Sequence, residues 1–121
     1  MPEIKEAASL NLDDIALIGK VEKEFEKIKG YKVKMHTLNT AENLEVLKKT
    51  SVSEDPIVKY DILKRNNLIF AIDTINSEAL SMQQKEAIIN KLQSAALDLF
   101  YDSYSELLEE QQKILGELKK N

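Results

Sequence analysis

The clearest pattern in the chain is an alternation of apolar and polar residues that begins just after Gly30. From position 31 to 37 the odd positions hold Tyr, Val, Met and Thr, and the even positions hold Lys, Lys and His. A period of two places successive side chains on opposite faces of an extended strand. The pattern therefore predicts a strand over about 31–38.

The preceding segment, 15–28, permits two interpretations. Its apolar residues at positions 15, 18, 21, 25 and 28 fit one face of a helix. Alternatively, 21–28 is a strand that turns at the following glycine and pairs with the next strand, so that its glutamates face Lys32 and Lys34. Opposite charges across a strand pair contribute roughly 0.2–1 kcal/mol each. We favour a hairpin over about 20–38, because a lone strand would leave its backbone groups without local partners.

Two helix starts follow the predicted hairpin. Asn39 or Thr40 can cap the first helix, with Glu42 in its first turn, and this helix is expected to end near Lys49. Asp55 and the proline after it form a stronger start signal, because proline suits the first helical position.

The second of these helices is predicted over 56–74. Its stretch from Leu68 to Ile72 is apolar on every side, which is typical of a helix segment buried at the centre of a core. After a break near Asn76, apolar residues recur at intervals of three and four from Met82 onwards. This spacing predicts one long C-terminal helix over about 82–118.

These elements define a fold class. We expect a mainly α protein with a small N-terminal β-hairpin, that is, an α+β fold with a long C-terminal helix. Residues 1–14 are interpreted as a flexible arm, and 15–121 as a single helical domain. A chain of 121 residues suits one domain that buries roughly two thirds of its unfolded surface.

Composition excludes several classes of function. The net charge is −4 and Arg65 is the only arginine, so nucleic acid is not expected as a partner. The absence of cysteine excludes a disulfide framework and thiolate chemistry. No apolar run is long enough to span a membrane, and the first residues lack the features of a signal peptide. We therefore expect a cytoplasmic location, with no membrane contact.

Candidate reactive groups are few. His36 is the only histidine, with no nucleophile or second metal ligand near it in sequence, and we interpret it as a structural surface residue. The spacing of the carboxylates Glu54, Asp55, Asp61 and Asp73 matches no calcium-binding loop. We expect no cofactor, no metal and no enzymatic activity.

The C-terminal helix offers a candidate interface instead. A helix of this length cannot bury its whole apolar stripe on so small a domain, so part of it is expected to pack on another chain. Tyrosine is common among residues that dominate binding energy. The predicted contact residues are Tyr101, Tyr104, Leu108, Leu115 and Leu118.

The order of elements over 19–118 also resembles that of a known family. The segments that carry the resemblance are the charged hairpin of Gly19-Lys20-Val21-Glu22 and Gly30-Tyr31-Lys32-Val33-Lys34-Met35, the strand-to-helix step Thr37-Leu38-Asn39-Thr40-Ala41-Glu42, a cap at Ser81, and Tyr104-Ser105-Glu106-Leu107-Leu108 leading into a polar terminal helix. In these respects the chain is similar to the tail and baseplate assembly chaperones of tailed bacteriophages. The long arm before position 19 and the predominance of lysine among the basic residues depart from that pattern.

The resemblance implies a non-enzymatic protein that binds a phage tail or hub component and shields it from premature association. Its location would be the host cytoplasm, with retention in the virion as a tail structural component left open. The alternative is a self-associating helical adaptor or regulatory protein outside a phage context. Both hypotheses predict function by protein–protein contact, with a homo-oligomer as a possible state.

Overall fold

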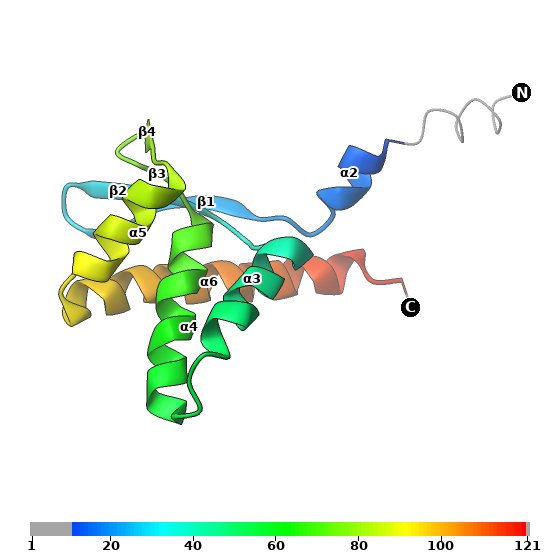
Figure 1. Cartoon of the computed structure of the whole chain (residues 1–121). Coiled ribbons are helices and arrows are strands. Elements are labelled where there is room, and N and C mark those ends of the chain that lie inside the picture. Colours follow the sequence, from blue (N-terminus) through cyan, green and yellow to red (C-terminus); the bar gives the residue numbers. More distant parts are fainter. Residues whose placement is uncertain (1–10, 121) are drawn as a thin grey trace, which may run out of the picture.

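The computed structural model describes residues 11–120, and Figure 1 shows their arrangement. These residues form five helices and four strands. In chain order they are α2 (Leu12–Ala16), β1 (Glu22–Ile28), β2 (Tyr31–His36), α3 (Thr40–Thr50), α4 (Pro56–Ala71), β3 (Ile72–Ile75), β4 (Glu78–Ala79), α5 (Met82–Lys91) and α6 (Ser94–Leu118).

The predicted hairpin is confirmed. Strands β1 and β2 pair antiparallel and turn at Gly30, whose φ of +89° favours glycine. Glu24 lies opposite Lys34, as the charge pattern predicts, and the Lys34 ammonium also lies 3.7 Å from the Glu22 carboxylate. Of the two interpretations of 15–28, the strand is confirmed for Glu22–Ile28, and the helix over the whole segment is wrong, because α2 (Leu12–Ala16) ends at Ala16.

The end of the helix predicted over 56–74 is wrong, and so is the position of the sheet. Helix α4 stops at Ala71, and Ile72–Ile75 forms strand β3 against β2. A tight turn with positive φ at Asn76 then leads into β4, giving a four-stranded antiparallel sheet in the order β1-β2-β3-β4. The sheet therefore lies in the middle of the chain and is larger than an N-terminal hairpin.

Pairing with a distant strand explains why β3 is not helical. The Asn76 amide donates to the Lys32 carbonyl at 2.7 Å, and the Lys32 amide donates to the Asn76 side chain at 2.8 Å. These bonds fix the β3 end against β2. The nearly buried Lys85 ammonium donates to the Ile72 carbonyl at 3.0 Å, and so ties α5 to the point where α4 becomes a strand.

Both predicted helix starts are confirmed. The Asn39 side chain accepts from the Glu42 amide, and the Glu42 carboxylate accepts in return from the Asn39 amide, which completes a capping box on α3. The Asp55 carboxylate accepts from the Ile57 amide at 2.9 Å at the start of α4. Local side-chain chemistry therefore sets where these two helices begin.

The helix predicted over 82–118 is two helices. Leu92 and Gln93 are extended, with ψ of 144° and 146°, and separate α5 from α6. This break allows Leu92 to pack against the core while α6 runs back across the sheet (Figure 1). The long C-terminal helix of the predicted fold is confirmed for Ser94–Leu118 only.

Helix α6 covers one face of the sheet. Phe25, Val33 and Met35 are buried on that face, and ion pairs join Lys23 to Glu110 and Lys27 to Glu106 along its edge. On the other face Glu22, Glu24, Lys32 and Lys34 are charged and exposed, so most of that face is solvated, and only His36 near its end is largely covered. Helix α4 crosses against α3, α5 and α6, and Leu68, predicted at the core centre, is fully buried.

Most of the flexible arm predicted over 1–14 lies outside the described residues. Its last part begins α2, where the Asn11 side chain accepts from the Asp13 amide. No residue of α2 is buried, and Ile18 just after it is 65% exposed. The Gly19 carbonyl after the helix accepts from the Gln111 side chain of α6 at 3.1 Å.

Candidate functional site: an uncharged groove between three helices

The structure divides the five predicted interface residues between two places. Tyr101, Tyr104 and Leu108 line a groove between α3, α4 and α6. Leu115 packs beside Gly19, and Leu118 near the end of α6 is 57% exposed. Tyr104 is only 3% exposed, so it is a wall of the groove and not the exposed anchor that the sequence predicts.

The groove has a volume of about 370 Å³. Every described residue that lines it is apolar or an uncharged polar residue. The apolar and aromatic members are Leu38, Val46, Leu47, Leu63, Tyr101, Tyr104 and Leu108, and the amide members are Asn43, Asn67 and Gln111. Such a surface favours uncharged groups and penalises a charged group that would lose its water.

Tyr101 and Tyr104 of α6 form a tyrosine wall of the groove, and Tyr60 of α4 packs on Tyr101 without lining the groove itself. The rings of Tyr60 and Tyr101 meet edge to face with centroids 6.3 Å apart, and those of Tyr101 and Tyr104 lie 6.1 Å apart. Burial raises the pKa of Tyr101, and it raises the pKa of Tyr104 to about 12. Both phenols are therefore neutral and available as hydrogen-bond donors and acceptors at neutral pH.

Two nearly buried polar groups in the groove stand without partners. Asn67 is 8% exposed and Tyr104 is 3% exposed, and neither side chain forms a hydrogen bond within residues 11–120. Among these residues, every side-chain nitrogen or oxygen that is wholly buried does have a partner. The polar atoms of Asn67 and Tyr104 therefore still reach solvent, and both residues line the groove.

The edge of α6 beside the groove is acidic. Asp98, Asp102 and Glu109 are exposed and lie four and seven residues apart, so they share one side of the helix. The Asp98 carboxylate accepts from the ammonium of Lys64 on α4 at 3.1 Å, and that ammonium also lies 5.0 Å from the Tyr60 ring centre. This contact places the acidic side next to the tyrosine wall.

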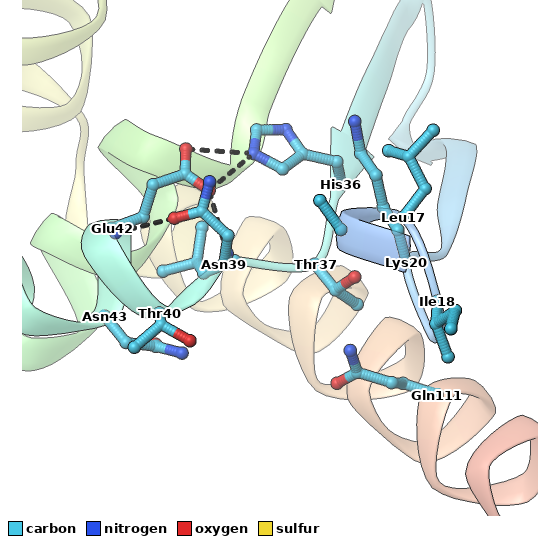
Figure 2. Close-up of a pocket in the computed structure, with 12 residues that line it drawn as sticks. Leu17, Ile18, Lys20, His36, Thr37, Asn39, Thr40, Glu42, Asn43 and Gln111 are labelled. Atoms are coloured by element: carbon cyan, nitrogen blue, oxygen red, sulfur yellow. Dashed lines mark hydrogen bonds and ion pairs between the residues drawn. The ribbon is translucent and has the colours of Figure 1, made fainter. Parts of the chain in front are cut away.

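A second hollow of about 490 Å³ adjoins the groove and contains His36 (Figure 2). Figure 2 shows His36, Asn39 and Glu42 joined on one side of it, with Gln111 of α6 on the other. His36 Nδ1 lies 2.8 Å from the Asp73 carboxylate, and Nε2 lies 3.1 Å from that of Glu42. Because both ring nitrogens are engaged, His36 joins β2, β3 and α3 and offers no free nitrogen to a substrate.

The remaining carboxylates with candidate roles are dispersed. Asp55 caps α4, Asp61 pairs with Arg65 at 2.8 Å, and Asp73 holds His36. Within residues 11–120, no cluster of three or more histidines and carboxylates could hold a metal ion.

The predicted site missed the residues that α3 and α4 contribute. The sequence does carry a signal for Asn67, because it is a polar residue directly before the stretch Leu68–Ile72 that is predicted to lie at the core centre. Leu47 and Asn43 carry none, because only the packing of α3 on α4 and α6 brings them to the groove.

The chain matches no protein-family model, no curated protein and no solved structure in the comparisons. None of the helices described over 11–120 is long and apolar enough to cross a membrane.

Proposed function

We propose that the protein is a non-enzymatic assembly chaperone, or a structural component, of a phage tail or baseplate, and that it acts by holding a segment of a tail or hub protein. The observation that carries the proposal is the uncharged groove between α3, α4 and α6. The resemblance of 19–118 to tail assembly chaperones supports the phage setting. The groove adds a concave surface through which such a protein can hold a partner.

The chemistry of the groove favours binding over catalysis. Its polar groups are amides and phenols, which neither attack a substrate nor exchange protons readily at neutral pH. The histidine next to it is held on both ring nitrogens by carboxylates. A binding role needs only shape, apolar contact and hydrogen bonds, and the groove offers all three.

A second candidate function rests on another surface. Leu17 and Ile18 are more than half exposed where the chain approaches Gly19, and Leu115 and Leu118 are exposed on the nearby end of α6. An apolar patch at this end favours the self-associating helical adaptor, with a second copy of the chain as the partner.

Co-expression tests the first function. The full chain is produced together with each tail-tube, tape-measure or hub protein encoded beside its gene, and the soluble fraction of that protein is measured. We expect one of them to stay soluble and to co-purify with the chain. If all of them behave identically with and without the chain, the chaperone function is wrong.

Light scattering tests the second function over a range of protein concentrations. A mass that stays at one chain at every concentration would contradict the self-associating adaptor, whereas a concentration-dependent dimer would favour it.

A further inference from the structure

We propose that the groove binds an apolar segment of the partner protein in extended form, that Asn67 and Tyr104 hydrogen-bond its main chain, and that lysine or arginine flanks it on the α6 side. This inference rests on the proposed function and names the chemistry of the bound segment.

The first step is the state of the two polar groups. Asn67 and Tyr104 are 8% and 3% exposed, and neither side chain forms a hydrogen bond within residues 11–120. Every wholly buried side-chain nitrogen or oxygen of the described residues does have a partner, so the polar atoms of these two residues still reach solvent. Because both residues line the groove, their hydrogen-bonding groups are open to a ligand there.

The second step is the kind of ligand that these groups select. An asparagine amide both donates and accepts, and so does a neutral phenol, which matches the N–H and C=O groups of a peptide main chain. The groups inside a helix already bond one another, so an extended segment is the form that offers them. A volume of about 370 Å³ has room for a few side chains and not for a whole helix.

The third step is the charge of the flanks. Asp102 and Glu109 form no ion pair within the described part of the chain, whereas Asp98 is paired with Lys64. On the α3 side, Lys48 is already paired with Glu45 at 3.5 Å. Lys113, one turn after Glu109 on the same side of α6, and Lys59, one turn before Leu63 on α4, also form no ion pair within residues 11–120. The unpaired charges on the α6 side are therefore two negative and one positive, and basic residues on the partner complement that side.

A second apolar hollow among the described residues lacks these features. It has a volume of about 330 Å³ and is lined by Ile28, Tyr31, Ile75, Ile88, Leu92 and Phe100. None of these residues is a nearly buried polar residue, since its one hydroxyl belongs to Tyr31, which is 53% exposed. This hollow supplies a matched control position.

The test uses the full chain and a random dodecapeptide library. Peptides are selected on the immobilised protein, and their affinities are measured by fluorescence anisotropy. We expect selected peptides to carry a short apolar centre beside lysine or arginine, with affinity that falls as salt rises. No enriched peptide, or enrichment of acidic peptides, would overturn the proposal.

Asn67→Leu and Tyr104→Phe remove the two hydrogen-bonding groups with little change in shape. Each substitution should lower the affinity for the selected peptides roughly two- to tenfold. Each should leave the melting temperature largely unchanged, because the group that is removed forms no hydrogen bond within the described residues and still reaches solvent. The control variants are Asn66→Leu, next to Asn67 but bonded to the Ile62 carbonyl, and Tyr31→Phe in the other hollow. These should bind as the unchanged protein does.

Wild-type affinity in Asn67→Leu and Tyr104→Phe would overturn the inference. Deletion of residues 2–10 provides a further arm, since a large gain in peptide affinity would show that the chain's own N-terminal segment occupies the groove.

The proposed function and the groove chemistry can fail separately. If the co-expressed tail protein is retained equally by the unchanged protein and the double variant, only the groove chemistry is wrong. If the unchanged protein retains none, the proposed function is wrong.

Discussion

His36 and Asp73 lie 37 positions apart in sequence and are joined by a contact of 2.8 Å between the imidazole Nδ1 and a carboxylate oxygen. The contact links β2 to β3, and the Nε2 of the same ring lies 3.1 Å from the Glu42 carboxylate at the start of α3. One side chain therefore connects the two central strands to the helix that forms one wall of the groove.

Replacement of His36 tests this connection. His36→Ala should lower the free energy of unfolding by about 1–3 kcal/mol, because it leaves the Asp73 side chain without its donor and leaves the Glu42 carboxylate with the Asn39 amide alone. His36→Asn keeps one donor near the position of Nδ1, so its free energy of unfolding should lie between those of the unchanged protein and His36→Ala. Urea denaturation measures the order. Equal stability of all three proteins would show that the contacts of the His36 ring do not stabilise the fold.

Alkaline pH should destabilise the protein through Tyr104. Burial raises the pKa of this phenol to about 12 from an ordinary value of 10.0, so the unfolded chain loses the proton first. The contribution of Tyr104 to stability is complete below pH 10 and is lost as pH rises towards 12, at a total of about 2–3 kcal/mol. The raised pKa of Lys64 acts in the same direction.

Denaturation at pH 8 and pH 11 separates these contributions. The loss of stability between the two should be smaller in Tyr104→Phe than in the unchanged protein, whereas Tyr31→Phe should not reduce it. An equal loss in all three proteins would contradict the assignment to Tyr104.

Leu68→Asp tests the position of the core. Leu68 is fully buried in α4, and an aspartate there would place an unpaired charge among apolar side chains. We expect no cooperative thermal transition by circular dichroism. Val52→Asp, at a position that is 78% exposed, is the control and should melt normally. A normal transition in Leu68→Asp would show that the core lies elsewhere.

Leu118→Glu tests the second candidate function. Leu118 is 57% exposed near the end of α6, so the substitution should leave stability within about 0.5 kcal/mol of the original. If the chain self-associates through this end, the dimer should weaken by tenfold or more in analytical ultracentrifugation. An unchanged dimer would remove the end of α6 from the interface.

Sequence patterns predict the hairpin and both helix starts because their causes are local. Alternation between residues 31 and 37 reflects the two faces of β2, and the side chains of Asn39 and Asp55 cap backbone groups within three residues. Such signals do not depend on the rest of the fold.

The two wrong elements have causes outside their own sequence. The apolar run that begins at Leu68 ends at Ile72, no glycine or proline follows before Asn76, and only pairing with β2 makes Ile72–Ile75 a strand. No proline or glycine marks the break at Leu92 and Gln93. That break places Leu92 on the core, which is a demand of packing.

The candidate site is predictable only in part for the same reason. Helical spacing alone places Tyr104 and Leu108 one turn apart on α6, but it indicates a different direction for Tyr101, which the structure brings to the same groove. Their partners Leu47 and Asn67 come from α3 and α4, whose packing on α6 the sequence does not state. That packing also explains why Tyr104 is buried.

The central claim is that this groove holds a segment of a tail or hub protein. The most direct test places a photoreactive amino acid at position 47 on the groove rim, and a second at position 118 for comparison, in the full chain co-expressed with the adjacent tail and hub proteins. Cross-linked peptides are then identified by mass spectrometry. The account predicts that position 47 cross-links to one short apolar segment of one such protein. Cross-links to tail or hub proteins from position 118 alone would contradict it.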